Sequence, residues 1–320
     1  MGNKVSIALC TYNGDKFLRE QLDSILNQTY QDFELIIVDD GSSDFTIQIV
    51  LEYMNKSNKI SLYQNENNIG FIKNFEKAIS LCSGDYIFLA DQDDIWLSNK
   101  IEFFLKEIKN NVLIYSDAIL IDREGNSKNE MLIYPKNLIS GSNNKAFLFD
   151  NCISGNTMMF KKELINYILP IPDNISFHDV WIAFVASTYG KITYTKTPLT
   201  LYRRYSEQIT SVNKKEYKNF FHRFKEKKAQ KIKYSIKHLN NLRAFSQLSI
   251  LKDEELIKII NQSIYHFQNY PKIFYNKNLH SLLRKYKNDI FAIQDSKKRD
   301  KLVFKLSLGL KVSTTLMFII

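Results

Sequence analysis

Residues 34–44 read ELIIVDDGSSD, and this stretch decides the class of fold that we expect for the chain. Its first part, Glu34–Val38, is an apolar run with the length and composition of a buried strand. The Asp, Gly and Ser residues that follow are those that turns prefer. A buried strand that ends in a polar turn is typical of open α/β sheets, in which ligands bind beyond the carboxyl ends of the strands.

Short apolar runs of the same kind lie on both sides of this stretch, with helical patterns between them. Apolar residues recur at the spacing of a helix in residues 18–26 and 71–79. We expect the further strands at Val5–Cys10, Ile60–Gln64, Tyr86–Ala90 and Val112–Ser116. The alternation of strands and helices predicts an α/β, Rossmann-related fold with a mainly parallel sheet flanked by helices.

The charge of the chain is unevenly divided. The sequence has 44 Lys and Arg residues against 34 Asp and Glu residues, and residues 211–311 hold 24 of the basic and only 8 of the acidic side chains. Helical patterns at Tyr217–Leu248 and Glu254–Phe267 dominate this part. We expect one domain over residues 1–210 and a helical, basic C-terminal region over 211–320. That region suits a negatively charged partner, either phospholipid, a pyrophosphate-linked acceptor or nucleic acid, although a solvated helical face carries the same charges.

Cysteine content and the chain ends bear on the compartment. Three cysteines are too few and too far apart for a disulfide framework or a zinc cluster, which indicates reduced thiols. The N-terminus lacks the pattern of a signal peptide, so we expect a cytoplasmic location. The uncharged residues 312–320 are too few to cross a bilayer, because a spanning helix requires about 20 apolar residues.

Polar clusters follow three of the predicted strands, at Thr11–Gly14, Asp39–Asp44 and Asp91–Asp94. We expect the three to converge at one edge of the sheet. The first two clusters suit a nucleoside, because the Asp40 carboxylate can accept the N3–H of uracil or thymine and Tyr12 offers a ring for the base. The alternative for Asp39–Asp44 is a turn followed by a helix cap.

The third cluster places three carboxylates, Asp91, Asp93 and Asp94, within four residues. Such groups repel one another unless a cation or a set of donors compensates them. A hard divalent ion, Mg²⁺ or Mn²⁺, bound by Asp91 and Asp93 and bridging to a diphosphate is the simplest explanation. The alternative, an acidic surface turn, fits poorly with the apolar strand that leads into it.

The ordered set of motifs resembles a known family, although each motif alone is weak. In sequence order the motifs are Thr11-Tyr12-Asn13, residues 34–44, Asn67-Asn68-Ile69-Gly70, and Gly84-Asp85-Tyr86-Ile87 leading to Asp91-Gln92-Asp93-Asp94. Over about residues 4–210 this set is similar to the family 2 inverting glycosyltransferases with the GT-A fold. Asp91–Trp96 together with His178–Trp181 resembles the branch that contains bacterial rhamnosyltransferases of surface-polysaccharide assembly.

The resemblance implies roles for individual residues. It implies a nucleotide-sugar part over 1–117 and an acceptor and catalytic part over 118–210, with Asp179 as the catalytic base. The residues implied to bind the nucleotide are Thr11, Tyr12, Asn13, Asp40 and Asp91, and the metal ligands are Asp91 and Asp93. The implied acceptor region comprises Asn151, Gly155, Asn156, Thr157, His178 and Trp181.

Two residue patterns bear on this assignment. Asp179 begins a helical pattern beside His178, where partial desolvation suits a base, although an N-cap aspartate has the same position. Many relatives have a histidine that can contact the metal shortly after Tyr-Arg in the segment that matches residues 201–205, and this chain has Tyr205 there. A third protein ligand is therefore in doubt, while Arg203 or Arg204 can neutralise the diphosphate.

We therefore predict an inverting, metal-dependent glycosyltransferase. It would move a hexose or deoxyhexose, with rhamnose preferred, from a dTDP- or UDP-sugar to a lipid-linked saccharide acceptor in capsule, O-antigen or cell-wall polysaccharide synthesis. The basic C-terminal region would hold it on the anionic inner face of the cell membrane as a peripheral protein.

Three other classes of protein remain as alternatives. A sugar-phosphate nucleotidyltransferase calls for a Gly-rich, basic loop after the first strand, and residues 11–15 have neither feature. Nucleic-acid binding fits the sequence pI of about 9.2 but leaves the acidic cluster unexplained, so we expect no nucleic-acid partner. A catalytically weak paralogue has the same sequence features as an active enzyme.

Overall fold

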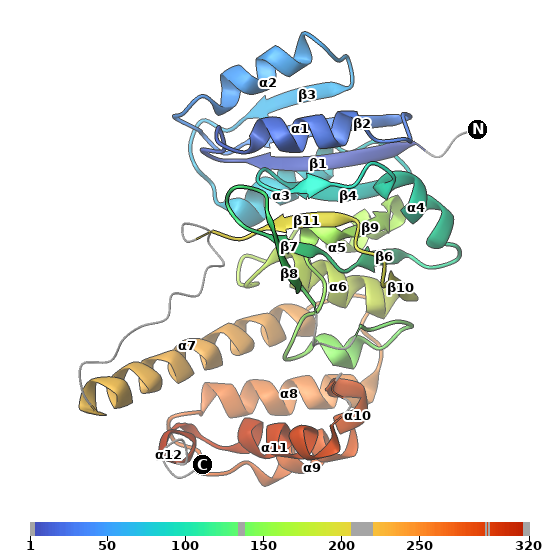
Figure 1. The fold of residues 1–320 in the computed structure, drawn as a ribbon. Coiled ribbons are helices and arrows are strands. Elements are labelled where there is room, and N and C mark those ends of the chain that lie inside the picture. Colours follow the sequence, from blue (N-terminus) through green and yellow to red (C-terminus); the bar gives the residue numbers. More distant parts are fainter. Residues whose placement is uncertain (1–3, 134–137, 206–219, 292, 294, 316–320) are drawn as a thin grey trace. The chain divides into compact units, whose positions relative to one another are not determined.

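The computed structural model describes residues 4–133, 138–205, 220–291, 293 and 295–315, and the side chains among them except at 220–224, 314 and 315 (Figure 1). The predictions for 206–219 and for 316–320 therefore lie outside the described residues. The chain divides into two compact units. The N-terminal unit comprises Met1–Ser142, Cys152–Ile171 and Phe177–Ser211, and the C-terminal unit comprises Asn143–Asn151, Pro172–Ser176 and Val212–Ile320.

A seven-stranded sheet forms the centre of the N-terminal unit, in the order β10-β6-β9-β4-β1-β2-β3. Strands β3, β2, β1 and β4 are parallel, whereas β9 runs antiparallel to both β4 and β6. The mainly parallel α/β sheet predicted from the sequence is therefore confirmed. Its strands are β1 (Val5–Thr11), β2 (Phe33–Asp39), β3 (Ile60–Gln64), β4 (Tyr86–Asp91), β6 (Leu113–Ser116), β9 (Met158–Lys161) and β10 (Ile192–Thr195).

Helices cover both faces of this sheet. On one face α1 (Leu18–Leu26), α2 (Thr46–Met54) and α4 (Lys100–Glu107) pack their apolar side chains on alternate residues of the strands. Helix α3 (Phe71–Leu81) packs on β1 and β2 with buried side chains outside that cluster, so it covers the other face. The alternation of side chains along buried strands produces these two apolar layers.

A second, four-stranded sheet has the order β5-β11-β7-β8 and was not expected from the sequence. Its strands β5 (Ile95–Trp96), β11 (Thr200–Arg203), β7 (Ile119–Ile121) and β8 (Ser127–Met131) have two to five residues, too few to show a period of two. Because β5 begins directly after Asp94 and pairs with β11, this small sheet brings residues 200–205 to the acidic cluster.

Short elements and α6 complete the N-terminal unit. They are η2 (Gly155–Thr157), η3 (Lys162–Leu164), α5 (Ile165–Ile168) and α6 (His178–Tyr189). The first turn of α6 lies against α3, where His178 stacks on Phe75 with ring centroids 4.1 Å apart.

The C-terminal unit is helical in its described part, as the sequence predicted. Helix α7 packs on α8, and α9 packs on α8 and α11. The N-caps Asp253, Asn276 and Asp295 accept hydrogen bonds from the backbone at the starts of α8, α9 and α11. Across the described residues, no helix combines the length and apolar character that a membrane span needs. The elements are η1 (Asn144–Phe147), α7 (Phe220–Ser246), α8 (Glu254–Gln268), α9 (Lys277–Lys285), α10 (Lys287–Ile290), α11 (Ser296–Ser307) and α12 (Leu310–Thr315).

Candidate functional site

The carboxyl ends of β1, β2 and β4 lie at one edge of the large sheet. In the strand register Thr11 lies opposite Asp39, and Cys10 lies opposite Asp91. The three polar clusters that follow these strands are therefore neighbours in space. This edge is where ligands bind in open α/β sheets.

The first carboxylate after β2 holds its own turn. Asp39 is buried and accepts hydrogen bonds from Thr11 Oγ1 at 2.8 Å, from the backbone N–H and hydroxyl of Ser42 at 2.8 and 2.6 Å, and from Gly41 N at 3.2 Å. Gly41 has a φ of +80°, which a residue with a Cβ rarely adopts. Thr11 and Asp39 therefore fix the shape of the turn.

The second carboxylate, Asp40, is also buried and nearly saturated by the chain. Its Oδ1 accepts from Asn65 Nδ2 and from Ile69 N, both at 2.8 Å, and its Oδ2 accepts from Gly70 N at 2.9 Å. A carboxylate offers about four acceptor positions, so one remains for the N–H of a nucleobase. The backbone donors come from the segment that leads into α3, which sequence reasoning noted only as a motif.

Gln92 joins the loop after β1 to the loop after β4. Its side-chain amide accepts from Tyr12 N at 2.7 Å and donates to Tyr12 O at 3.0 Å. A Cβ on Gly14 would lie 2.3 Å from Gln92 Oε1, so a larger residue here would displace the Gln92 side chain from Tyr12. The Tyr12 side chain is 47% exposed, which leaves its ring accessible to a base. Asn13, with a φ of +48°, accepts from Ser43 N at 2.9 Å and so ties this loop to the turn after β2.

In the acidic loop after β4 the pKa values of two carboxyl groups are raised. Burial, followed by the charges of Asp93 and Asp179, raises the pKa of Asp91 to about 7. Burial, with the charges of Asp93 and Asp91, raises the pKa of Asp94 well above its ordinary value. The effect of Asp179 on Asp91 also means that the predicted base and the predicted metal ligand are close enough for their charges to interact.

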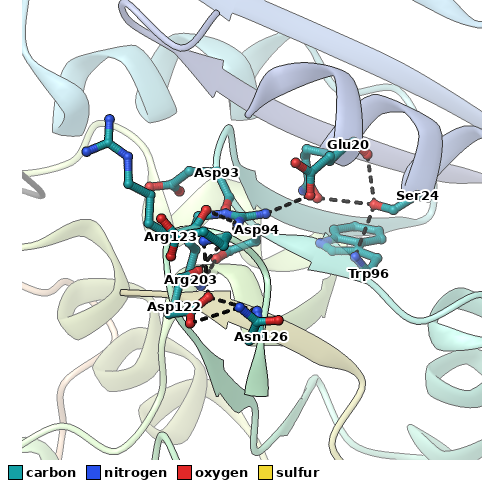
Figure 2. A network of polar contacts seen from close by, with 11 residues as sticks. Glu20, Ser24, Asp93, Asp94, Trp96, Asp122, Arg123, Asn126 and Arg203 are labelled. Atoms are coloured by element: carbon teal, nitrogen blue, oxygen red, sulfur yellow. Dashed lines mark hydrogen bonds and ion pairs between the residues drawn. The ribbon is translucent and has the colours of Figure 1, made fainter. Parts of the chain in front are cut away.

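Arg203 holds the acidic loop through its backbone and its side chain. Its backbone N donates to Asp94 Oδ1 at 3.1 Å, and its Nε donates to the Asp93 carbonyl at 2.9 Å. Figure 2 shows the guanidinium between Glu20, to which Nη2 donates at 2.8 Å, and the Arg123 carbonyl, to which Nη1 donates at 2.7 Å. Because Arg203 is 1% exposed and used in this way, a diphosphate could reach it only by displacing one of these contacts.

Arg204 and Tyr205, the two residues after Arg203, make different contacts. The Tyr205 hydroxyl donates to Asp93 Oδ2 at 2.8 Å, and its ring lies 5.1 Å from that of Phe17. The Arg204 guanidinium lies 5.5 Å from the ring centre of Tyr202, and its Nε has no hydrogen-bond partner among the described residues. Of the two predicted diphosphate contacts, Arg204 is therefore the one with donor capacity left.

The buried Lys100 contacts residues that lie next to the acidic loop. Lys100 Nζ donates to the Asn156 carbonyl at 2.6 Å and to Thr200 Oγ1 at 2.9 Å, and it lies 3.7 Å from the ring centre of Trp96. Burial lowers the pKa of Lys100, and the charges of Asp94 and Asp91 oppose that shift. No sequence motif marked Lys100, because its partners are distant along the chain.

Asn156 lies between Lys100 and the acidic loop. Its Nδ2 donates to Asp94 Oδ2, so its amide faces the carboxylates. Its Oδ1 is buried and has no hydrogen-bond partner in the described part of the chain. A buried carbonyl oxygen without a partner costs free energy, and a ligand at the loop would relieve that cost.

Among the other predicted acceptor residues, His178 and Gly155 are in contact. His178 is buried, burial lowers its pKa to about 3, and within the described residues neither of its ring nitrogens has a partner. A Cβ on Gly155 would lie 2.7 Å from His178 Nε2, so Gly155 makes room for the imidazole. The neutral His178 therefore packs beside Asp179 as an uncharged neighbour.

The remaining acceptor predictions fall elsewhere. Thr157 Oγ1 donates to the Ser154 carbonyl at 2.8 Å, and the buried Trp181 donates from Nε1 to the Ile168 carbonyl at 2.8 Å. Both side chains thus hold the local backbone. Asn151 belongs to the C-terminal unit.

The carboxylates of the acidic loop fit a divalent cation in chemistry but do not enclose one. In the described parts of the chain no three His, Cys, Asp or Glu side chains are grouped so that they could hold a metal ion. Carboxylate oxygens are hard ligands of the kind that Mg²⁺ and Mn²⁺ prefer. Ligands from outside the chain would have to complete the coordination.

Comparison with known proteins gives the family. The model of the glycosyl transferase family 2 matches residues 6–168, more than half of the chain, and the chain therefore belongs to this family. An uncharacterized glycosyltransferase of Haemophilus influenzae is 26% identical over 280 residues, which cover 82% of this chain and 85% of that protein. The O-antigen biosynthesis glycosyltransferase WbnJ of Escherichia coli is 32% identical over 164 residues, covering 50% of this chain and 63% of WbnJ.

Solved structures share the fold. TarS residues 1–349 of S. aureus in complex with UDP-GlcNAc superpose with a TM-score of 0.62 and 16% identity, over 98% of this chain and 88% of that chain. The mannosyltransferase PcManGT of Pyrobaculum calidifontis, in complex with GDP-Man and Mn²⁺, gives a TM-score of 0.56 at 16% identity, over 95% and 79%. At these identities the likeness shows the fold alone, and it confirms the GT-A-like fold expected from the motifs.

Proposed function

We propose that this family 2 glycosyltransferase acts in polysaccharide biosynthesis and transfers a sugar from a nucleoside-diphosphate donor with inversion, using a divalent cation. The observation that carries the proposal is the meeting of three groups at one sheet edge. These are the nearly saturated Asp40, the acidic loop in which the pKa of Asp91 is raised, and Asp179, whose charge acts on Asp91. In our proposal these groups serve as the nucleoside site, the diphosphate and metal site, and the base.

Each group has a role in a single displacement. Asp40 accepts the N–H of the base, the Tyr12 ring covers it, and Arg204 approaches the diphosphate. Asp91 and Asp93 would hold Mg²⁺ or Mn²⁺, which supplies compensation for the charge of the leaving nucleoside diphosphate. Asp179 takes the proton of the acceptor hydroxyl as that oxygen attacks the anomeric carbon. The neighbouring His178 is neutral, because burial lowers its pKa to about 3.

The donor and acceptor are proposals at a finer level. We propose a dTDP- or UDP-sugar, with rhamnose first among the candidates, and a lipid-linked saccharide as the acceptor. WbnJ, named for O-antigen biosynthesis, supports a surface polysaccharide, and the structural neighbours were solved with UDP-GlcNAc and GDP-Man. Those two ligands belong to the neighbours, so the donor has to be found by assay.

A peripheral location at the inner face of the membrane is part of the proposal. Helix α7 has eight Lys and Arg residues against one Glu, and its exposed surface includes Ile232, Tyr234 and Ile236. Exposed apolar side chains among lysines suit an anionic lipid surface better than a merely solvated face. Flotation with phosphatidylglycerol vesicles should carry the protein, and Ile232→Ser with Ile236→Ser should release it. Equal flotation of wild type and the double variant would count against this attachment.

The decisive experiment follows donor hydrolysis. Purified protein with Mn²⁺ or Mg²⁺ is incubated with UDP-, dTDP- and GDP-sugars, and nucleoside-diphosphate release is recorded for wild type, Asp93→Ala and Asp179→Ala. We expect release from one donor, lost on chelation and in both variants. Glu124→Gln, which removes an exposed carboxylate at the turn between β7 and β8, should retain it. Release that survives chelation and both substitutions would overturn the proposal.

A further inference from the structure

The C-terminal unit exposes three aromatic side chains that lie close together. Phe274 and Tyr275, in the connection between α8 and α9, are 74% and 39% exposed, and Phe304 on α11 is 43% exposed. The ring centres of Tyr275 and Phe304 lie 6.3 Å apart. We call Phe274, Tyr275 and Phe304 the aromatic patch. Exposed apolar side chains that gather in one place are typical of a surface that binds a partner.

A cavity lined by basic side chains adjoins the aromatic patch. The cavity has a volume of about 220 Å³, and α9 and α11, which contribute to its wall, pack on each other (Figure 1). The His280 ring lies 5.4 Å from that of Tyr275 and 6.5 Å from that of Phe304, so the wall of the cavity meets the patch at His280. We call this cavity the cationic pocket. Its lining residues are His280, Arg284, Lys287, Asp300 and Val303.

The chain uses only part of the donor capacity of the cationic pocket. Lys287 Nζ donates to Asp300 Oδ1 at 2.5 Å, so this cation is paired. The exposed guanidinium of Arg284 forms no hydrogen bond or ion pair within the part of the chain that the structure describes. Burial and the charge of Arg284 lower the pKa of His280, and its buried Nδ1 has no partner among the described residues. The pocket therefore offers a guanidinium and a neutral imidazole, both of which can donate to phosphate oxygens.

The surroundings of the pocket carry an excess of positive charge. Residues 272–305 have ten Lys and Arg side chains against three Asp. At α7, burial, followed by the charges of Lys305 and Lys227, lowers the pKa of Lys231 to about 8. Lysines of α7 and α11 therefore repel one another. An anionic surface placed against these helices would relieve the repulsion.

Rings beside basic side chains suit either a membrane or a nucleic acid, and the geometry favours the membrane. A nucleic-acid strand is held by a basic groove that follows its backbone, with rings on which successive bases stack. The cationic pocket is a single cavity, which suits one phosphate group. Phe274 and Phe304 have no polar atom in the side chain and gain free energy by leaving water, whereas the Tyr275 hydroxyl suits the headgroup level of a bilayer.

We propose that the cationic pocket binds the phosphate of an anionic phospholipid headgroup while the aromatic patch enters the membrane interface beside it. Arg284 binds the phosphate oxygens and His280 is the second donor. Phe274 and Phe304 lie at the boundary between headgroups and acyl chains. The inference rests on the membrane location proposed above and adds to it a headgroup site on helices other than α7.

Flotation with phosphatidylcholine vesicles, with and without phosphatidylglycerol, tests the aromatic patch. We expect binding only when phosphatidylglycerol is present. Phe274→Ser with Phe304→Ser should lower the partition coefficient by about tenfold or more, because two rings no longer leave water. Tyr265→Ser removes a 57% exposed ring of α8 outside the patch and should bind as wild type. Thermal unfolding of each variant without vesicles shows whether it is folded.

Arg284→Lys tests the cationic pocket separately, because it keeps the charge but loses the planar fork that binds phosphate oxygens. Binding to phosphatidylglycerol vesicles should weaken about fivefold. Lys298→Arg exchanges the same two residue types on the exposed surface of α11 outside the pocket and should bind as wild type. Calorimetry with glycerol 3-phosphate and with inorganic phosphate should show much weaker binding than to vesicles, because neither probe engages the aromatic patch.

Four results would overturn the headgroup site. Equal flotation of wild type, Arg284→Lys and the double Phe variant would place the attachment elsewhere. Tight binding of inorganic phosphate or glycerol 3-phosphate without vesicle binding would assign the pocket to a soluble phosphate. Retention of a single-stranded oligonucleotide instead of vesicles would assign the surface to nucleic acid. A dimer that the double Phe variant dissociates, without flotation, would assign the patch to a second copy of the chain.

The outcomes separate this inference from the proposals on which it rests. The folded double Phe variant should release nucleoside diphosphate from its soluble donor at the wild-type rate, so the transferase is judged independently. If Ile232→Ser with Ile236→Ser releases the protein from vesicles and the double Phe variant does not, the membrane location stands and the headgroup site is wrong. If wild-type protein does not float at all, the membrane location and the headgroup site both fail, and the donor assay still decides the transferase.

Discussion

Two carboxylate-rich turns lie at the same sheet edge, on either side of the end of β1, and are built in opposite ways. After β2, Asp39 and Asp40 receive hydrogen bonds from donors of their own chain, four at Asp39 and three at Asp40. After β4, Asp91, Asp93 and Asp94 repel one another, and burial raises the pKa of Asp91 and of Asp94.

This difference shows that one sheet edge can combine a turn stabilised by its own chain with a loop whose carboxylates repel one another. The β2 turn is fixed by folding alone, because donors of the chain already bind its two carboxylates. The β4 loop is held in place by Arg203 and Tyr205, yet burial and neighbouring charges raise the pKa values of Asp91 and Asp94. Preorganised groups of this kind are costly in the free protein and useful when the ligand arrives.

The largest effect on rate should come from substitution of Asp179, whose charge acts on Asp91 of the acidic loop. Asp179→Asn removes the base while keeping its shape, and a positioned base contributes about 10²–10⁴-fold to rate. We expect sugar transfer to fall by that factor with nucleotide binding retained, as measured by initial rates and calorimetry. Transfer at more than a tenth of the wild-type rate would assign the base elsewhere.

Next in size is the loss of a carboxylate from the acidic loop. Asp93→Asn should lower donor hydrolysis by about 10²–10³-fold, because a bound cation supplies several kcal/mol of charge stabilisation. The free energy of unfolding should change by only about 1 kcal/mol, because one source of repulsion is removed along with the Tyr205 contact. Urea denaturation checks the second value. A stability loss as large as the one expected below for Asp39→Asn would mean that the acidic loop and the β2 turn do not differ in this way.

Substitution in the turn after β2 should lower the stability of the protein, whereas substitution in the acidic loop should lower its rate. Asp39→Asn turns one acceptor oxygen into a donor that faces the donors of Thr11 and Ser42. Burying unmatched donors costs about 1–3 kcal/mol each, so we expect a loss of about 2–3 kcal/mol in urea denaturation. Asp32→Asn, on the loop before β2, is a matched control. Unchanged stability of the Asp39 variant would mean that the turn tolerates loss of its donors.

The buried His178, whose ring nitrogens have no partner among the described residues, should make the stability of the protein depend on pH. Since burial lowers the pKa of His178 to about 3 from 6.5, the folded state resists protonation and its stability is complete above pH 6.5. As the pH falls from 6.5 to 5 it should lose about 2 kcal/mol. His178→Leu should remove that part of the acid sensitivity, and denaturation at pH 7.5 and 5.0 measures it. His238 and His266, with pKa values lowered to about 4 by burial, keep the remainder.

The smallest effect is expected at Asp94. Its raised pKa indicates that the loop disfavours its charge, so Asp94→Asn should change the free energy of unfolding by less than about 1 kcal/mol. The Asn156 amide can rotate so that its partnerless Oδ1 accepts from the new side chain. Urea denaturation of Asp94→Asn and Asp39→Asn in the same experiment compares the free energies of unfolding of the two variants. A loss of 2 kcal/mol or more would show that the Asp94 charge is needed for folding.

The sequence predicted the strands of the large sheet and the polar residues at their ends because both are local patterns. A buried strand and its turn are readable within a dozen residues, which gave Asp40, the acidic loop and the start of α6. The second sheet was missed because its strands are too short for periodicity. The inclusion of residues 143–151 and 172–176 in the C-terminal unit was missed because membership of a unit depends on distant contacts.

The sequence by itself thus determined the α/β fold, the family and the chemical types at the sheet edge. Only the tertiary structure decided which groups meet there. It placed Gln92 on Tyr12, Lys100 under Asn156, and Arg203 and Tyr205 on Asp93, and it brought the charge of Asp179 to Asp91. These pairs are far apart along the chain, and their contacts depend on the packing of whole elements. Local periodicity carries no information about such packing, whereas the folded backbone fixes each distance.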